Sequence, residues 1–269
     1  MLQQAIDFKE ESDAIHALLE SLSDADYARP TLFKDWTIND IIQHLHFFNE
    51  MADLSYTDEA TFTARYATMR QRRDNGGTLV SVTNDMLDGI KGRDLLALWR
   101  DYYEPMAQRW QAADPKQRVV WVGPSMSVRS SMTARLMETW SHAQAIYDLL
   151  GVDRPQADRI KNVAVIGINT FGWTFVNRGE DVPDDMPYVR LEAPSGAHWD
   201  WGTPATDNLI SGSAVEFCQV VTQCRNIADT GLKVVGETAN RWMAMAQCFA
   251  GPPQDPPAPG TRYRADPSN

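Results

Sequence analysis

The sequence predicts an α+β protein, in which an N-terminal four-helix bundle precedes a small α+β domain. Long segments before Gly151 repeat apolar side chains at helical spacing. Beyond that residue, short segments alternate apolar and polar side chains in the manner of strands. A chain of 269 residues with 43% hydrophobic content is large enough for two cores. We expect the bundle over residues 1–152, the α+β domain over 153–251 and a flexible proline-rich tail over 252–269.

The helices of the bundle follow from apolar periodicity and from signals at their ends. Thr37 and Asp40 have the spacing of a capping box, in which each side chain binds a backbone amide at the start of a helix. Gly76 and Gly77 interrupt the chain, and Gly151 stands where a glycine commonly ends a helix. The expected elements are long helices over 2–22, from 37 onward, over 95–110 and over 127–150, with a weaker helix over 62–73 and an extended piece over 119–124.

The second domain is expected to be a small sheet with helices on one side. Residues 188–194 and 198–201 alternate like strands and are joined by a Ser195-Gly196 turn. Ser213 and Glu216 have the spacing of a second capping box, which predicts a helix up to Val221. The other expected elements are helices over 160–175 and 238–249 and a short strand at 209–210.

Charge and composition indicate a small-molecule partner. The net charge of −11 argues against binding to nucleic acid or to an anionic membrane, because both require a basic surface. No segment approaches the length of apolar sequence that spans a bilayer. The three cysteines lack the spacing of a disulfide framework or a zinc–thiolate site. We therefore expect a cytoplasmic protein, either a monomer or a homodimer.

The pair Glu138 and His142 is the strongest candidate for a functional site. Four residues separate them, so both side chains project from the same face of a mostly apolar helix. A metal site that performs chemistry commonly has three protein ligands and an open position. A third ligand must then come from another helix. His44 and His46 lie on opposite flanks of the apolar stripe of the second helix, so helical phase leaves both open.

Four motifs of this chain stand out together, namely Trp36-Thr37-Ile38-Asn39-Asp40, His44-Leu45, Glu138-Thr139-Trp140-Ser141-His142 and Asp148-Leu149-Leu150-Gly151. In these motifs the chain resembles the DinB-like metalloprotein superfamily. Within it, the chain is similar to the mycothiol-dependent maleylpyruvate isomerase type, and most closely to a subgroup described as metal-binding or wyosine-base-formation-like proteins. The resemblance implies an N-terminal metal-binding bundle and a C-terminal domain related to sterol carrier proteins.

The resemblance assigns the metal ligands to His44, Glu138 and His142. Two arginines are further candidates for the site. Arg135 shares the helix face of Glu138 and could anchor a substrate carboxylate, and the alternatives are a plain ion pair with Glu138 or solvent exposure. Arg225 stands where related proteins place arginines that reach the metal pocket. The preceding residue is a cysteine where a second arginine is expected, which weakens the transfer of an isomerase mechanism.

These expectations describe a metal-dependent enzyme, with Zn²⁺ as the first choice and Ni²⁺, Fe²⁺ or Mn²⁺ as alternatives. The resemblance implies a low-molecular-weight thiol as cofactor, and an isomerase or thiol transferase acting on a small anionic or electrophilic substrate. A non-catalytic metal-binding or ligand-carrier protein and a metal-dependent hydrolase are the competing hypotheses. His16 and His198 belong to no pattern. Four tryptophans are interpreted as core packing, namely Trp36, Trp140, Trp199 and Trp201.

Overall fold

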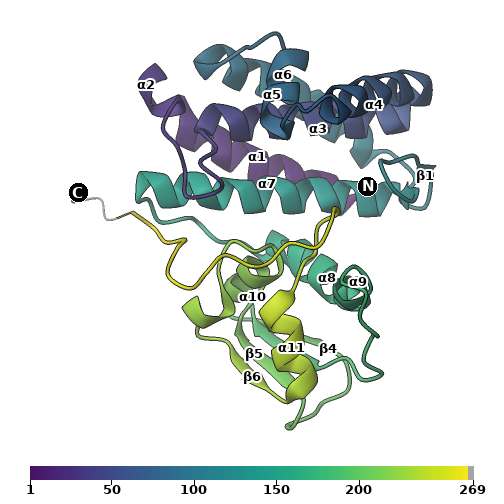
Figure 1. Cartoon of the computed structure of the whole chain (residues 1–269), viewed down its shortest axis with the longest axis vertical. Helices are drawn as coiled ribbons and strands as arrows, with labels where there is room; N and C mark the ends of the chain where they lie inside the picture. Colours follow the sequence, from purple (N-terminus) through teal and green to yellow (C-terminus); the bar gives the residue numbers. More distant parts are fainter. Residues whose placement is uncertain (266–269) are drawn as a thin grey trace. The chain divides into compact units, whose positions relative to one another are not determined.

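The computed structural model describes residues 1–265 and divides into two compact units (Figure 1). The first unit comprises Met1–Ile146, and the second begins at Tyr147. This division falls inside a long helix and a few residues before the predicted boundary at residue 152. The predicted fold class is confirmed, since a helical N-terminal region is followed by a region that contains a sheet.

The first unit is helical except for one short hairpin. The four predicted long helices correspond to α1, α3, α6 and α7, and the predicted weaker helix corresponds to α4. The predicted extended piece at 119–124 is mostly wrong, because only its first residue lies in a strand. The elements are α1 (Gln3–Glu20), α2 (Asp24–Tyr27), α3 (Ile38–Thr57), α4 (Glu59–Asp74), α5 (Leu79–Met86), α6 (Gly92–Gln111), β1 (Arg118–Val119), β2 (Met126–Ser127) and α7 (Val128–Leu150).

The core of the first unit is built around α6, which contacts both α1 and α3. Trp99, Tyr103 and Trp110 on α6 are fully buried, as their spacing along one helical face requires. A buried carboxylate on α3 is satisfied within this core. Asp53 accepts hydrogen bonds from the indole Nε1 of Trp110 at 2.9 Å, from the hydroxyl of Tyr102 at 3.3 Å and from the guanidinium of Arg109. The polar group therefore does not oppose packing of the bundle.

The predicted capping box at the start of α3 is confirmed. The Thr37 hydroxyl accepts a hydrogen bond from the backbone N–H of Asp40, and the Asp40 carboxylate accepts one from the backbone N–H of Thr37 at 2.8 Å. Two amides at the helix start are thereby satisfied. This cap fixes where α3 begins, and so it sets the position of His44 along the bundle.

The predicted capping box of the second unit is wrong. Ser213 precedes α10 but makes no side-chain cap. The Glu216 carboxylate instead accepts a hydrogen bond from the backbone N–H of Gly231 at 2.9 Å. A tertiary partner has replaced the local one, although the helix begins and ends where the sequence predicted.

These two positions give a matched test of local capping. We expect Thr37→Ala to lower the free energy of unfolding by about 1 kcal/mol, because an N-cap hydrogen bond is lost. Ser213→Ala removes a hydroxyl that caps nothing, so it should change the free energy by less than about 0.5 kcal/mol. Urea unfolding followed by circular dichroism measures both. Equal effects of the two substitutions would show that the Thr37 cap does not stabilise α3.

The second unit combines a four-stranded sheet with short helices. The strand order is β4-β3-β5-β6, in which β3 and β5 are parallel and the other neighbours are antiparallel. The predicted strands at 188–194, 198–201 and 209–210 correspond to β3, β4 and β5, and β6 was not predicted. The elements are η1 (Asp158–Ile160), α8 (Lys161–Asn169), α9 (Phe171–Val176), β3 (Tyr188–Glu192), β4 (His198–Trp201), β5 (Leu209–Ser213), α10 (Ala214–Val221), η2 (Ile227–Asp229), β6 (Lys233–Val235) and α11 (Glu237–Met245).

Helices cover one face of this sheet, which α10 contacts at β3 and β5. Along β3, Val189 and Leu191 are buried toward that face, and they alternate with the exposed residues Arg190 and Glu192. On α8, Gly167 allows close packing, because a Cβ there would lie 2.9 Å from a methyl group of Val221 on α10. The predicted alternation of apolar and polar residues thus has its expected cause.

Two predicted helices of this unit differ from the observed ones. The predicted helix over 160–175 is divided at Thr170, whose hydroxyl donates to the carbonyl of Ile166 at 2.8 Å. The predicted helix over 238–249 ends at Met245. The next residue, Ala246, is extended, and its carbonyl accepts from the Gln223 side chain at 3.0 Å. In this second case a tertiary hydrogen bond takes the place of continued helix.

The proline-rich segment has fixed partners in the second unit over residues 252–265. Arg178 donates to the Asp255 carboxylate at 2.9 Å, and the side chain of Asn226 donates to the carbonyl of Pro257 at 2.8 Å. The N–H of Ala265 donates to the carbonyl of Asp148 at 2.7 Å. The amino-acid composition of this segment predicted a loose tail. Tertiary hydrogen bonds such as these cannot be predicted from composition. Residues 266–269 of that prediction lie outside the described part of the chain.

Among the helices of residues 1–265, none combines the length and the apolar character that crossing a bilayer requires.

Candidate metal centre

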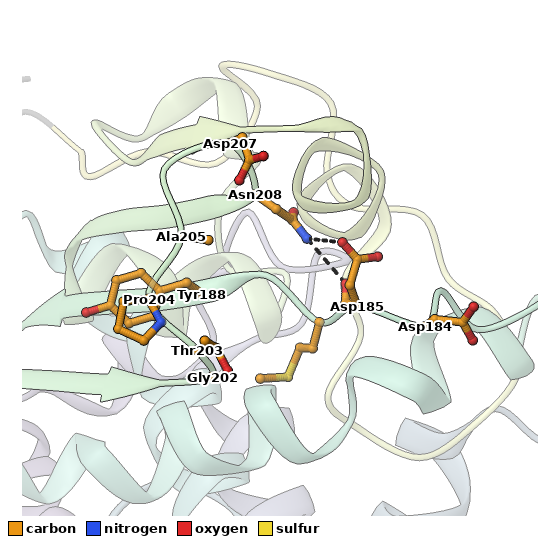
Figure 2. A pocket seen from close by; sticks show the side chains of 10 residues that line it. Asp184, Asp185, Tyr188, Gly202, Thr203, Pro204, Ala205, Asp207 and Asn208 are labelled. Atoms are coloured by element: carbon orange, nitrogen blue, oxygen red, sulfur yellow. Dashed lines mark hydrogen bonds between the residues drawn. The ribbon is translucent and has the colours of Figure 1, made fainter.

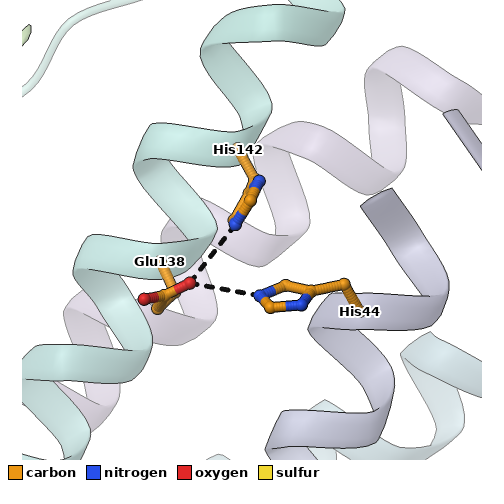
Figure 3. Close-up of side chains that lie close together, drawn as sticks. All are labelled: His44, Glu138 and His142. Carbon is orange, nitrogen blue, oxygen red and sulfur yellow. Dashed lines mark hydrogen bonds and ion pairs between the residues drawn. The ribbon is translucent and has the colours of Figure 1, made fainter. Parts of the chain in front are cut away.

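Three side chains from two helices of the first unit converge on one point. Figure 3 shows Glu138 and His142 on α7 and His44 extending from α3 toward the same carboxylate. The Oε2 atom of Glu138 lies 3.2 Å from Nε2 of His44 and 3.3 Å from Nε2 of His142. The candidate ligand atoms of all three residues lie within 4.8 Å of one another. The predicted trio is therefore a spatial cluster.

Burial and charge keep this cluster in the state that binds a cation. The side chains of His44, Glu138 and His142 are 9%, 23% and 11% exposed. Burial, followed by the effect of His142, lowers the pKa of His44 to about 4, so its imidazole is neutral at pH 7. Burial alone would raise the pKa of Glu138, but hydrogen bonds from both histidines hold it well below its ordinary value. A neutral imidazole and an ionised carboxylate are the forms that coordinate metals.

The donor set fits a divalent metal ion. Ligand bonds of about 2.0–2.2 Å at tetrahedral angles place neighbouring ligand atoms about 3.3 Å apart. The two nitrogen–oxygen distances of this cluster, 3.2 and 3.3 Å, match that separation. Nε2 is the nitrogen of His44 that faces Glu138, and Nδ1 of the same ring is buried without a hydrogen-bond partner. The residues present thus agree with the group that the sequence predicted.

Within residues 1–265, His44, Glu138 and His142 form the only cluster of three or more candidate ligands. His46, the alternative that helical phase left open, is directed elsewhere. Its Nε2 lies 3.7 Å from the Glu50 carboxylate, and its ring meets the edge of Tyr102. His16 is buried on α1, and His198 is exposed on β4. The position of α7 therefore shows that His44, and not His46, faces Glu138. The helical phase of α3 alone could not decide between the two.

Aromatic rings surround the two histidines. Trp36 stacks on His142 with ring centroids 5.6 Å apart, and Phe33 meets the same ring edge-on at 5.0 Å. Phe48 packs against His44 at 4.8 Å. The interpretation of Trp36 as a core residue alone is thus incomplete, because its indole lies against a candidate ligand. An apolar surrounding of this kind excludes water and strengthens electrostatic interactions at the centre.

The loop that holds Phe33 and Trp36 has an unusual backbone. Lys34 and Asp35 both adopt the left-handed conformation, with φ of 54° and 57°. Such a conformation costs of order 1–3 kcal/mol for each non-glycine residue. The carbonyl of Trp36 accepts from the N–H of Thr31 at 2.8 Å, which closes the loop. No local sequence pattern indicated this turn, so the aromatic contacts to His142 were not predicted.

Arg135 lies on α7 before Glu138 and is 3% exposed. Its Nε donates to the side-chain oxygen of Asn49 on α3 at 3.1 Å. Its guanidinium lies over the ring of Phe48, 6.0 Å from the centroid, and Phe48 in turn contacts His44. Burial lowers the pKa of Arg135 to about 10, which leaves it charged at pH 7. Asn49 was not singled out in the sequence, because its partner lies far along the chain.

Arg225 belongs to the second unit and is engaged by a carboxylate. Its two terminal nitrogens donate to the two oxygens of Asp148 at 2.7 and 2.6 Å, in a bidentate pair. Burial alone would lower the pKa of Arg225, but the hydrogen bond and charge of Asp148 raise it. The predicted catalytic role of Arg225 stays a prediction, and a substrate anion would have to displace Asp148 to use it.

A separate pocket lies in the second unit, beside the ends of β3, β4 and β5 (Figure 2). Asp184, Asp185 and Asp207 line it. The Asn208 side chain donates to the Asp185 carboxylate at 2.9 Å, so one of these acids already has a partner. Their carboxylates do not cluster closely enough to hold a metal, in contrast to the centre on α3 and α7.

The chain's own thiols are placed away from solvent. Cys218, Cys224 and Cys248 are all buried, and each is a thiol outside any disulfide. Burial raises the pKa of Cys218 and of Cys224, and the thiolate is the reactive form of cysteine. We expect iodoacetamide at pH 8 to label none of the three in the folded protein during a time that labels all three in guanidinium chloride. Mass spectrometry measures this, and rapid labelling of the native chain would show an accessible internal thiol.

The fold and the donor set together define the class of DinB-like proteins, in which a helical bundle carries a histidine–carboxylate centre. The chain belongs to the family of the mycothiol maleylpyruvate isomerase N-terminal domain, whose model matches residues 8–147. The resemblance predicted from the sequence is thereby confirmed.

Relatives and solved structures agree with this assignment. Two uncharacterized proteins, from two strains of Mycobacterium tuberculosis, are each 36% identical over 247 residues, which is 92% of this chain and 95% of theirs. Two crystal structures of the mycothiol-dependent maleylpyruvate isomerase, one of them a histidine-to-alanine mutant, match with TM-scores of 0.52 and 0.51. They are 14% and 13% identical and cover 81% of this chain and 87% of theirs. At that identity they establish the fold alone.

Proposed function

We propose that this chain is a metal-dependent isomerase or thiol transferase that acts on a small anionic or electrophilic substrate with the help of a low-molecular-weight thiol. The convergence of His44, Glu138 and His142 carries the proposal. Three protein donors are the number found in catalytic zinc sites, which keep one position for water or substrate. Membership of the isomerase family supports the thiol and the reaction type.

In this proposal the three donors bind a divalent ion, with Zn²⁺ as the first choice and Ni²⁺, Fe²⁺ or Mn²⁺ as alternatives. The bound ion would lower the pKa of a thiol or water at the open position. Glu138 contributes the negative charge and the two histidines contribute neutral nitrogens. Trp36 and Phe48 pack against the imidazoles, and so they hold the rings in position and keep bulk water away.

The isomerisation needs a nucleophile that adds to the substrate and is released unchanged at the end. A thiolate sulfur forms a bond to one carbon of a conjugated double bond, and the electron pair moves to the conjugated carbonyl oxygen. Rotation about the resulting single bond follows. The electron pair then returns, the carbon–sulfur bond breaks and the thiolate is released, so no oxidant or reductant is consumed. Because the chain's own cysteines are buried, we assign the thiol to an external molecule such as the mycothiol of the family name.

The test is turnover of maleylpyruvate by the zinc-loaded full chain, with and without mycothiol, followed by ultraviolet absorbance. We expect activity only when both zinc and the thiol are present, and loss of activity with a chelator. Turnover of an ester without thiol would indicate the hydrolase instead. If small thiols do not bind the zinc, and neither maleylpyruvate nor the ester is turned over, the chain would be the non-catalytic metal-binding or carrier protein. Either result would overturn the proposal.

A further inference from the structure

Two polar groups beside the metal centre are buried without any hydrogen-bond partner. They are the terminal Nη2 of Arg135 on α7 and the side-chain Nδ2 of Asn49 on α3. Arg135 is 3% exposed and Asn49 is 0% exposed. An unpaired buried donor costs roughly 1–3 kcal/mol, and more when it is charged. Such groups are few in native proteins, and a bound ligand is one of the arrangements that satisfies them.

The two donors belong to side chains that are hydrogen-bonded to each other. The Asn49 side-chain oxygen accepts from Nε of Arg135 at 3.1 Å, which orients the guanidinium and leaves the Asn49 amide hydrogens unused. Phe48 packs against both the guanidinium and the imidazole of His44. The unused hydrogens are therefore positioned on the same helices that hold His44 and Glu138. Both are donors, so the missing partner must be an acceptor.

Charge indicates which acceptor is missing. Glu138 is the acidic group that acts on Arg135, and Glu138 is itself held by two histidines. With a divalent ion present, the ion, Arg135 and Glu138 together carry two net positive charges. A thiolate or hydroxide at the metal supplies one negative charge. One further anion is required for a neutral buried site, and a planar carboxylate matches the geometry of a guanidinium.

We infer that Arg135 and Asn49 form a receptor for one carboxylate of the substrate, next to the metal position. This inference rests on the proposed function, which it deepens by limiting the substrate to carboxylic acids whose reacting group can reach the metal at the same time. Arg135 and Asn49 then select and orient the substrate. The carboxylate accepts from both unpaired donors and replaces a buried cost by two charge-assisted hydrogen bonds.

The test compares two thiols of equal size, 3-mercaptopropionate and 3-mercaptopropionamide, on the cobalt-loaded full chain. Thiolate binding to cobalt is followed by its charge-transfer absorbance. We expect the carboxylate to bind at least about tenfold more tightly than the amide, as a charge-assisted pair provides. In Arg135→Met and in Asn49→Leu this preference should fall to near unity, while affinity for the amide is retained. A preference that persists in both variants would overturn the receptor.

Stability supplies a second readout, which separates a receptor from a structural role. The double variant Arg135→Met with Asn49→Leu removes the buried charge and both ends of its hydrogen bond, so its melting temperature without ligand should equal or exceed that of the wild type. A structural arginine would give a large decrease. In addition, added 3-mercaptopropionate should raise the melting temperature of the cobalt-loaded wild type more than that of the variant.

Failure of the proposed function has a different signature. If neither thiol changes the cobalt spectrum of the wild type, the proposed binding of a thiol at the metal is wrong. The carboxylate receptor is then tested separately with succinate, which has no thiol. Calorimetric titration of zinc-loaded wild type and Arg135→Met with succinate should then show at least about tenfold weaker binding to the variant. Equal binding, or none to either protein, would end the inference. If the chain holds no metal, the same titration is made on the metal-free proteins with the same criterion.

Discussion

Glu138→Ala is expected to release the bound metal from the protein. Both histidine nitrogens lie within 3.3 Å of one Glu138 oxygen, so its removal deletes a donor and the negative charge that offsets the cation. Loss of residues that merely support a metal ligand costs 10–100-fold in affinity, so loss of a ligand should exceed about 100-fold. Metal content after purification without chelator, and competition with a coloured chelator, measure the effect.

The same loss is expected for His44→Ala and for His142→Ala. His198→Ala provides the control, because His198 is an exposed histidine on β4 of the other unit. That variant should keep a full equivalent of metal. If Glu138→Ala and His142→Ala also kept a full equivalent, the centre on α3 and α7 would not be the metal site. His46→Ala would then be the next variant to examine, since His46 lies beside Glu50.

Arg225→Met is expected to lower the free energy of unfolding by about 3–5 kcal/mol, because it removes the bidentate ion pair with the buried carboxylate of Asp148. The double variant Arg225→Met with Asp148→Leu removes both charges and should recover most of that loss. Chemical unfolding of the full chain measures each. The result also bears on catalysis. If Arg225 serves catalysis and not stability, Arg225→Met would lower the activity and leave the free energy of unfolding unchanged.

A control for this effect is available on the surface of the sheet. Arg190 on β3 lies 4.0 Å from Asp200, and both side chains are about half exposed. Exposed pairs of this kind contribute between about 0 and 1 kcal/mol, so Arg190→Met should be nearly neutral. If Arg225→Met were no more destabilising than Arg190→Met, the pair with Asp148 would not anchor this part of the second unit.

Local signals predicted the parts of the fold that local interactions determine. The capping box at Thr37 forms because both of its partners lie within one turn of helix. The similar pattern at Ser213 does not form, since Glu216 has a partner fifteen residues away. β6 has three residues, which is too short for an alternation to be recognised. Periodicity therefore predicted the long helices well and the short elements poorly.

The candidate site divides in the same way. Glu138 and His142 share a helix, so their spacing alone predicted that they would face one another. Whether His44 or His46 faces them depends on where α7 packs, which is tertiary information. Asn49 and Arg135 are separated by 86 residues, so no window of sequence joins them. The orphaned donors of this pair become visible only when both helices are in place.

The indole of Trp36, parallel to the His142 ring, gives the centre an optical consequence. Its emission should respond when an ion enters, and the response should depend on the electronic configuration of that ion. Paramagnetic nickel or cobalt would quench the fluorescence of a neighbouring indole, whereas closed-shell zinc would not. Subtracting the spectrum of Trp36→Phe isolates this signal from the other tryptophans. The chain thus contains its own indicator for the identity of the ion it holds.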